Sequence, residues 1–207
     1  FIARIHLTQG RFQESQQAAQ NGLRRGDAPM TALYNVQLLN PVWNNAGLGR
    51  NVYVPARRFD TLYLRQDPTD TARIKLRGPT VRSGFTFFIQ TKYPAQDSPI
   101  PFLTWQENEL MLAETELRLQ NNTTSALARI NSVRASYPGL RALPSSTPTT
   151  LDVLYAERDK ELFLTGVRLL DQQRLNRWHL RSDTWRYLPI VLPEINNNPN
   201  LPPLVRD

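Results

Sequence analysis

Cysteine is absent from the 207 residues, which excludes disulfides, thiolate metal sites and a thiol nucleophile within them. Histidine occurs only twice, at His6 and His179, and neither has ligand-like partners near it in the sequence. The sequence also lacks a glycine-rich phosphate loop, a nucleophile elbow and any metal-ligand spacing. We therefore expect no catalytic residues, no metal and no cofactor.

Long hydrophobic runs are missing as well. No apolar stretch approaches the roughly eighteen residues of a membrane-spanning helix, and no signal peptide is visible. The chain starts at Phe1, in the middle of a helical pattern rather than at a methionine. We expect that an N-terminal part of the gene product, with any export signal, precedes this chain.

Blocks of like charge are absent too, although the chain is basic. Lysines and arginines number 25 against 18 aspartates and glutamates, which gives a formal net charge of +7. Such a charge suits nucleic acid, anionic lipid or an acidic protein. The arginine pairs at 24–25 and 57–58 are scattered, however, so the nucleic-acid footprint is weak. We expect a basic surface and no nucleic-acid partner.

Helical periodicity is present in two separate regions. Residues 1–26 predict two helices that meet at Gly10 and pack as a hairpin ending at Gly26. Residues 105–136 predict a second hairpin, with Thr104 as the cap of its first helix. The small and apolar positions that define the packed faces are Ala3, Leu7, Phe12, Ser15, Ala19, Leu23, Leu110, Ala113, Leu117, Ala126, Ile130 and Val133. We therefore expect a mainly α fold of tetratricopeptide-like helical hairpins.

Residues 27–104 have a different character. Prolines recur, asparagine and glycine cluster in "NPVWNNAGLGRN", and short apolar runs such as "FTFFIQ" replace the helical pattern. We expect a long, largely irregular excursion with a few short strands or helical turns. A segment of this kind in a compact domain usually has a functional reason.

The C-terminal third predicts one more helix and a tail. Residues 151–180 have helical character, with Thr150 or Asp152 as the cap. Prolines exclude a regular helix over residues 185–207, whose apolar residues suit an extended strap against the core. Three tryptophans lie in or beside these packed segments, and we expect them to serve the core: Trp105, Trp178 and Trp185.

Within that helix, the stretch "ERDKELFLTGVRLLDQQRL" carries charges along an otherwise apolar surface. On a helical wheel Glu157, Glu161 and Arg168 fall within about 40° of one another, with Asp171 on the adjacent flank. A helix so nearly surrounded by apolar groups is buried, and buried charges persist only when they are paired. We interpret the four residues as an internal structural clamp rather than as catalytic carboxylates, for which the sequence offers no cleft. Gly166 predicts a close approach of another backbone.

The same stretch resembles the signature helix of the RagB/SusD family. The shared positions are Glu157, Arg158, Glu161, Leu162, Gly166, Arg168, Asp171 and Arg174. The closing "YLPIVLPEINNNPNL" is similar to the terminal strap of the family, and "ENELMLAETELRL" followed by "ALARINSVRA" is similar to its penultimate hairpin. The order and spacing of three separate matches make the resemblance specific. It covers residues 104–201 well and 1–26 loosely, which indicates the C-terminal part of a family member.

The resemblance implies a lipid-anchored protein at the outer-membrane surface of bacteria. Such proteins are not enzymes: they bind a nutrient, often an oligosaccharide and sometimes a peptide, and act with a TonB-dependent, SusC-like transporter. The cysteine that bears their lipid lies at the N-terminus. The resemblance therefore places the anchor outside this chain, in agreement with the missing cysteine.

The segment "NPVWNNAGLGRNVY" is the best candidate for ligand binding. Trp43 can stack on a sugar ring, Asn44, Asn45 and Asn51 can bond hydroxyl groups, and Tyr53 can do either. The alternative is structural, with Trp43 anchoring the loop and the asparagines serving as turn residues. A second function also stays open, namely a helical-repeat module that binds another protein and no small molecule.

Overall fold

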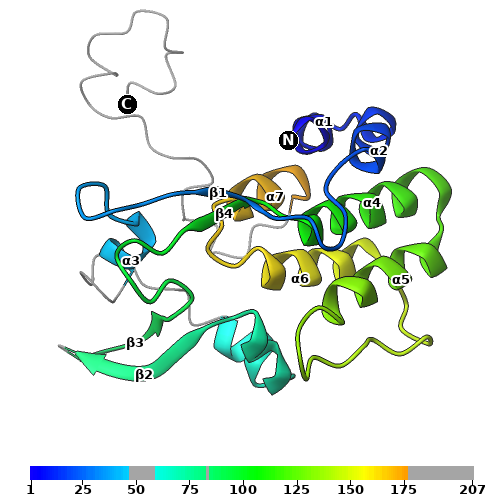
Figure 1. Cartoon of the computed structure of the whole chain (residues 1–207). Coiled ribbons are helices and arrows are strands. Elements are labelled where there is room, and N and C mark those ends of the chain that lie inside the picture. The colour runs from blue at the N-terminus through cyan, green and yellow to red at the C-terminus, as the bar shows by residue number, and fades with distance from the viewer. Residues whose placement is uncertain (47–58, 83, 177–207) are drawn as a thin grey trace, which may run out of the picture.

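The computed structural model describes residues 1–46, 59–82 and 84–176, and within them the fold is mainly helical with two small antiparallel sheets (Figure 1). The helices are α1 (Ile2–Thr8), α2 (Phe12–Gln20), α3 (Pro41–Asn45), α4 (Trp105–Gln120), α5 (Thr123–Arg134), α6 (Leu151–Glu161) and α7 (Arg168–Arg174). The expectation of a mainly α fold is confirmed for these residues.

The first two helices pack against each other across a buried polar contact. The Ser15 hydroxyl of α2 donates a hydrogen bond of 2.9 Å to the Ala3 carbonyl of α1, and the turn between them uses Gly10 at φ 73°. Helix α2 ends at Gln20, earlier than the predicted stop at Gly26. The side chain of Asn108 explains this early end, because it donates hydrogen bonds to carbonyls at the end of α2 and just beyond it.

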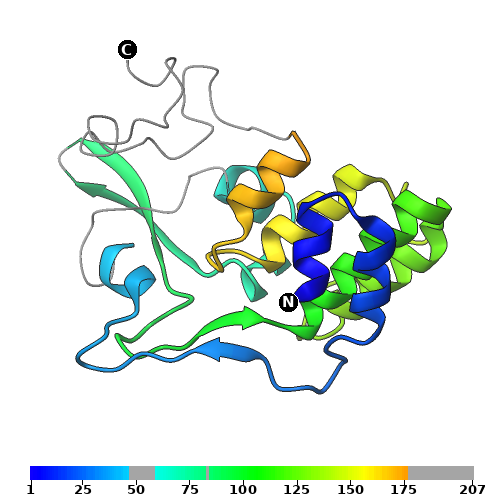
Figure 2. The same cartoon turned by 90° about the horizontal axis from the view of Figure 1, so that it is seen from above.

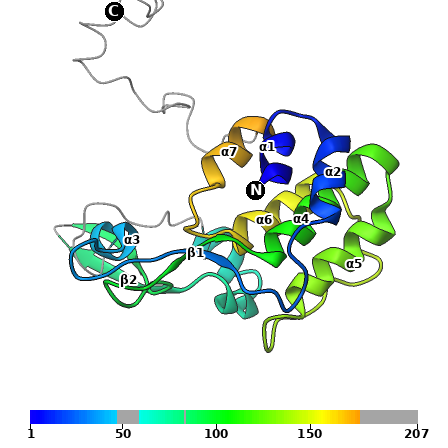
Figure 3. The same cartoon turned by 45° about the horizontal axis from the view of Figure 1, so that its top comes forward.

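Helices α4, α5 and α6 share the main hydrophobic core. The Thr104 hydroxyl accepts a hydrogen bond of 3.1 Å from the Glu107 N–H, so the predicted cap of α4 is confirmed. The buried side chains of this core are Trp105, Leu110, Ala113, Ala126, Ile130, Val133 and Leu154. A second cluster, in which Met111 and Leu112 meet Ala3, Leu7 and Ala19, docks α1 and α2 onto α4 (Figure 3).

Two small sheets give the excursion most of its regular structure. Strands β1 (Met30–Ala32) and β4 (Ile100–Leu103) pair antiparallel near its two ends, while β2 (Leu76–Arg82) pairs antiparallel with β3 (Phe85–Gln90). A π-helix, η1 (Asp60–Leu64), and a 3₁₀ helix, η2 (Pro68–Ala72), precede β2. In Figure 2 the β2–β3 sheet and α3 lie to one side of the helices.

A third cluster fastens the excursion to the helices. Phe59 and Ile74 from the excursion are buried against Phe163, which follows α6, and the rings of Phe59 and Phe163 meet edge to face with centroids 4.7 Å apart. The excursion is therefore packed on the helical core and not only joined to it at its ends.

The single helix predicted for residues 151–180 is broken in the structure. Helix α6 ends at Glu161 and α7 begins at Arg168, with Leu164 at φ 58° and Gly166 at φ 89° in the turn between them. Among the described residues a Cβ added at Gly166 meets nothing within 4 Å, so the predicted close approach of another backbone is wrong for this part of the chain. Glycine suits this position because of its positive φ. At the start of α6 the cap at Thr150 is confirmed, because its hydroxyl accepts from the Val153 N–H.

Several predictions lie outside the described residues and stay predictions. They concern the strap at 185–207, the end of the predicted helix beyond residue 176, the second arginine pair at 57–58, and His179, Trp178, Trp185, Asn51 and Tyr53.

Candidate functional site

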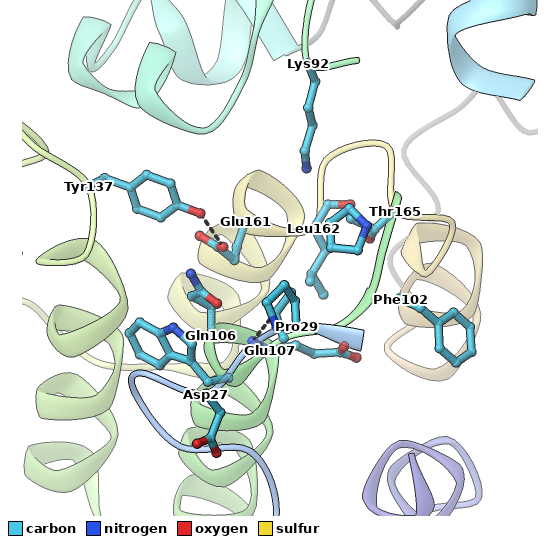
Figure 4. Close-up of a pocket in the computed structure, with 13 residues that line it drawn as sticks. Asp27, Pro29, Lys92, Phe102, Gln106, Glu107, Tyr137, Glu161, Leu162 and Thr165 are labelled. Carbon is cyan, nitrogen blue, oxygen red and sulfur yellow. Dashed lines mark hydrogen bonds between the residues drawn. The ribbon is translucent and has the colours of Figure 1, made fainter. Parts of the chain in front are cut away.

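A cavity of about 270 Å³ opens where the helices meet the ends of the excursion (Figure 4). Its walls come from β4, the first turn of α4, the end of α6 and the turn after it, and from the segments that follow α2, β3 and α5. The lining residues are Asp27, Pro29, Lys92, Pro101, Phe102, Thr104, Trp105, Gln106, Glu107, Tyr137, Glu161, Leu162 and Thr165.

Glu161 places a buried carboxylate at the wall of this cavity. Its Oε1 accepts a hydrogen bond of 2.6 Å from the Tyr137 hydroxyl, as Figure 4 shows. Its Oε2 is buried and has no hydrogen-bond partner among the described residues, and the Arg73 guanidinium lies 3.9 Å away. Burial raises the pKa of Glu161, which the Tyr137 hydrogen bond and the charge of Arg73 only partly oppose.

Lys92 brings a cation to the same cavity from the segment after β3. Its Nζ donates a hydrogen bond of 2.6 Å to the Phe163 carbonyl in the turn after α6. Burial lowers the pKa of Lys92 to about 8, although the charge of Glu161 acts in the opposite direction. The neighbouring Tyr93 hydroxyl donates to the Leu164 carbonyl at 3.1 Å, so both residues hold the turn that forms part of the wall.

The remaining charges at the cavity are paired or exposed. Glu107 accepts a hydrogen bond of 2.7 Å from Arg4 Nε, and the Arg4 guanidinium also lies 5.0 Å from the centre of the Phe102 ring. Asp27 is exposed and accepts from the Arg24 N–H. The described lining thus has two buried carboxylates, Glu107 and Glu161, and one lysine, Lys92, while the charge of Glu107 is balanced by Arg4 outside the lining.

A network of buried ion pairs lies behind Glu161, centred on Glu157. The Glu157 carboxylate contacts Arg73 at 2.9 Å, Arg134 at 3.0 Å and Lys160 at 2.5 Å. Burial raises the pKa of Glu157, but the charges of Arg73, Lys160 and Arg134 outweigh it and lower the value to about 2. Arg73 also pairs with Asp70, so the network joins α6 to η2 in the excursion.

A separate buried network surrounds Asp171 on α7. Its carboxylate accepts hydrogen bonds from Arg158 at 2.9 and 3.1 Å and from Arg174 at 2.8 Å. Arg174 also donates to Glu114 of α4 at 2.8 Å. Helix α7 is thus tied to α6 through the Asp171–Arg158 pair and to α4 through the Arg174–Glu114 pair.

The four residues interpreted as a clamp therefore do not form one stripe. The break after Glu161 separates Glu157 and Glu161, which meet Arg73, from Asp171. Arg168 pairs with Asp159, which also accepts from the Tyr63 hydroxyl. The three carboxylates are buried and Arg168 is half-buried. A clamping role for all four stays a prediction.

Comparison with known proteins shows what this arrangement resembles. The sequence matches no family model and no curated protein. A SusD superfamily protein from Bacteroides vulgatus ATCC 8482 superposes with a TM-score of 0.64 at 18% identity, over 84% of this chain and 47% of that chain. Another, from Bacteroides thetaiotaomicron VPI-5482, superposes with a TM-score of 0.67 at 20% identity, over 96% of this chain and 57% of that chain.

The chain has a SusD-like fold. It spans about half the length of the two SusD superfamily structures. None of the helices in the described part of this SusD-like chain has the length and apolar character needed to cross a membrane. The same residues contain no cluster of three or more His, Cys, Asp or Glu side chains suited to a metal ion.

The described part of the segment predicted to bind ligand, residues 40–46, contains the short helix α3 of the SusD-like fold. Asn40 caps α3 by accepting from the N–H groups of Val42 and Trp43, and its side-chain amide donates to the Ser98 carbonyl at 2.6 Å. Trp43, Asn44 and Asn45 are half-buried on α3. Among the described residues that line the cavity of Figure 4, none belongs to α3. Helix α3, the described part of the predicted segment, and the cavity are thus two different places.

Sequence reasoning identified Glu161 as a buried charge but not the cavity. Several other polar lining residues come from distant parts of the chain, among them Lys92, Gln106 and Tyr137. Nothing in their local sequence distinguishes them from surface residues. Tertiary contacts bring them to the cavity: Lys92 bonds the Phe163 carbonyl, and Tyr137 bonds Glu161.

Proposed function

We propose that the protein binds a nutrient and takes part in glycan uptake at the bacterial cell surface. The SusD-like fold carries this proposal, because SusD superfamily structures superpose on 84% and 96% of the chain. The proposed ligand is an oligosaccharide, with a peptide as the second ligand class. The protein binds this ligand without transforming it.

The proposal includes a partner and a location. A TonB-dependent, SusC-like transporter receives the nutrient, and the protein is held at the outer membrane by a lipid anchor outside this chain. The two packed helix pairs α1–α2 and α4–α5 form a tetratricopeptide-like scaffold in this proposal, and residues 185–207 form its strap.

The proposed oligosaccharide contacts are Trp43, Asn44 and Asn45 of α3, together with Asn51 and Tyr53. The short helix supports the proposal, because its cap at Asn40 is tied to Ser98 and so presents a fixed set of side chains. An indole ring offers a flat apolar face for a sugar, while the amides offer donors and acceptors for hydroxyl groups.

Calorimetry of the protein against a panel of soluble glycans and peptides tests the proposal. We expect one class of glycan to bind and Trp43→Ala to weaken this binding at least about tenfold, which corresponds to about 1.4 kcal/mol. Leu33→Ala serves as the control, because this apolar residue of the excursion is 76% exposed. Loss of binding in both variants would contradict a site at Trp43. The alternative of a protein-binding helical module gains support if no glycan or peptide binds and a protein partner co-purifies.

A further inference from the structure

We propose that residues 30–38 are a contact surface for a second copy of this chain. The contact is twofold, with Leu33 in the middle of the segment near the axis, so that each copy offers the same residues to the other. The surface is independent of the proposed nutrient binding, since none of its residues is a proposed ligand contact.

The first observation is a concentration of exposed apolar side chains. Four large hydrophobic residues lie within these nine positions, on β1 and the turn that follows it. Their exposed fractions are 60% for Met30, 76% for Leu33, 73% for Val36 and 62% for Leu38. A single exposed apolar residue is ordinary on a protein surface, but a group of them marks a place where another molecule binds.

The second observation is the ordered backbone of this segment. The Asn35 side chain accepts hydrogen bonds of 2.8 Å from the N–H groups of Gln37 and Leu38, and the Asn35 N–H donates to the Leu38 carbonyl at 3.0 Å. These bonds form a tight turn that presents Val36 and Leu38 to the surface. Because the turn is already ordered, binding there loses less conformational entropy.

The third observation is the absence of charge. Residues 28–46 contain no aspartate, glutamate, lysine or arginine, although these four make up 21% of the chain. The centres of protein–protein interfaces are depleted of charged residues in the same way. Segments that bind a lipid surface combine apolar residues with lysine or arginine instead. The composition therefore favours a protein over a membrane.

The net charge of the chain favours a second copy as this protein. At +7, two copies repel each other when their charged surfaces approach. The repulsion is weakest where a surface has no charge, and an uncharged apolar surface is complementary to itself. An acidic partner, in contrast, would find no cation within residues 28–46 with which to pair.

The fourth observation is a strand edge. Among the described strands β1 pairs only with β4, and Figure 2 shows β1 on the outer side of β4. An edge strand offers backbone N–H and C=O groups to a neighbouring strand. A twofold axis brings two identical edges together antiparallel, so the small sheet of one copy can continue into that of the other.

Sedimentation equilibrium of the chain tests this contact. We expect a monomer–dimer equilibrium with a micromolar dissociation constant. Leu33→Asp should raise this constant at least about tenfold, because it places two like charges near the axis. Leu119→Asp is the matched control at an exposed leucine of α4, and it should leave the constant unchanged. Thermal unfolding checks that both variants are folded.

A mixture of two variants tests the symmetry of the contact. Leu33→Asp mixed with Leu33→Lys should associate more tightly than either variant alone, since opposite charges then meet at the axis. Cross-linking provides an independent measurement, because the chain has no cysteine of its own. Oxidation should join two copies of Leu33→Cys much faster than two copies of Leu119→Cys.

Three results would overturn the inference. The first is a chain that stays monomeric up to about 1 mM. The second is equal behaviour of the variants at Leu33 and Leu119 in sedimentation or in cross-linking. The third is a monomer that binds vesicles of phosphatidylethanolamine and phosphatidylglycerol and loses this binding in Leu33→Asp, which would assign the segment to a lipid surface.

Discussion

Two buried carboxylates one turn apart on α6 have opposite electrostatic surroundings. Glu157 is 2% exposed and lies against three cations, Arg73, Arg134 and Lys160. Glu161 is 7% exposed, has one described hydrogen bond and keeps one oxygen without a hydrogen-bond partner in the described part of the chain. The structure therefore stabilises the ionised form of Glu157 and penalises that of Glu161.

The two glutamates should respond differently to the same substitution at pH 7. Glu157→Gln leaves buried cations without their shared anion, and we expect it to lower the free energy of unfolding by about 3–5 kcal/mol. Glu161→Gln removes a charge that the protein solvates poorly, and we expect a change below about 1 kcal/mol. Urea unfolding of both variants measures the difference. Equal losses of unfolding free energy in the two variants would show that the ion pairs of Glu157 do not determine its contribution to stability.

The contribution of Glu157 should also depend on pH. Its folded-state pKa of about 2 lies below the ordinary value of 4.5, so its ionisation stabilises the fold above pH 4.5. This stabilisation, about 3 kcal/mol from the size of the shift, should be lost as the pH falls from 4.5 toward 2. Unfolding curves across this range should show the gap between the original protein and Glu157→Gln closing. Glu161 acts in the opposite sense, because its raised pKa lets the folded protein gain stability as it takes up a proton.

At the scale of elements, the break between α6 and α7 determines where the buried charges lie. Two residues that follow β3 hold the turn, since Lys92 bonds the Phe163 carbonyl and Tyr93 bonds the Leu164 carbonyl. Both contacts span 71 positions in the sequence. A helical wheel of residues 157–175 takes no account of these long-range contacts, so the sequence predicted one continuous helix there. Gly166 was the one local sign of a break in this stretch, since glycine adopts a positive φ without strain.

Gly166→Ala tests how much the turn depends on this backbone conformation. A Cβ there meets no atom of the described residues within 4 Å, so we expect a loss of about 1–2 kcal/mol in unfolding free energy, which comes from the left-handed conformation. Gly166→Asn is the matched control, because asparagine tolerates this conformation better, and it should lose less. Thermal or urea unfolding of the pair decides the matter. An alanine variant as stable as the asparagine variant would contradict the explanation.

At the scale of the whole molecule, Asn108 links the two helix pairs. Its side-chain amide donates to the Ala19 carbonyl at 2.8 Å and to the Leu23 carbonyl at 3.1 Å, across more than 80 positions of sequence. Gly22 lies so close that a Cβ there would come within 2.5 Å of the same side chain. The end of α2 is therefore set by contact with α4.

Asn108→Ala should loosen this docking. We expect a loss of about 1–3 kcal/mol in unfolding free energy, because partly buried carbonyls lose their donor. Hydrogen exchange at the amides of α2 should accelerate more than exchange in α5. Asn21→Ala is the control, since Asn21 is exposed and its side chain bonds only the Gln17 carbonyl in the described structure. Similar exchange rates for α2 in both variants would show that Asn108 does not dock the helix.

The sequence predicted what depends on local periodicity and missed what depends on distant partners. Ala126, Ile130 and Val133 are fully buried as expected, because a 3.6-residue period determines which face a helix buries. The cavity was not predictable, since Tyr137 and Lys92 lie 24 and 69 positions from Glu161 in the sequence and share its lining only in the folded chain. The SusD-like fold was found from motif order in residues 104–201, where such local patterns are densest.

The pairing of β1 with β4 has an evolutionary consequence. Because Met30 lies opposite Leu103, the excursion leaves the helices and returns to them through two neighbouring strands. Insertions and substitutions between β1 and β4 can therefore occur without displacing α2 or α4, so this part of the chain can vary as a unit. Phe59 and Arg73 limit such exchange, because their partners Phe163 and Glu157 belong to the helical part of the molecule.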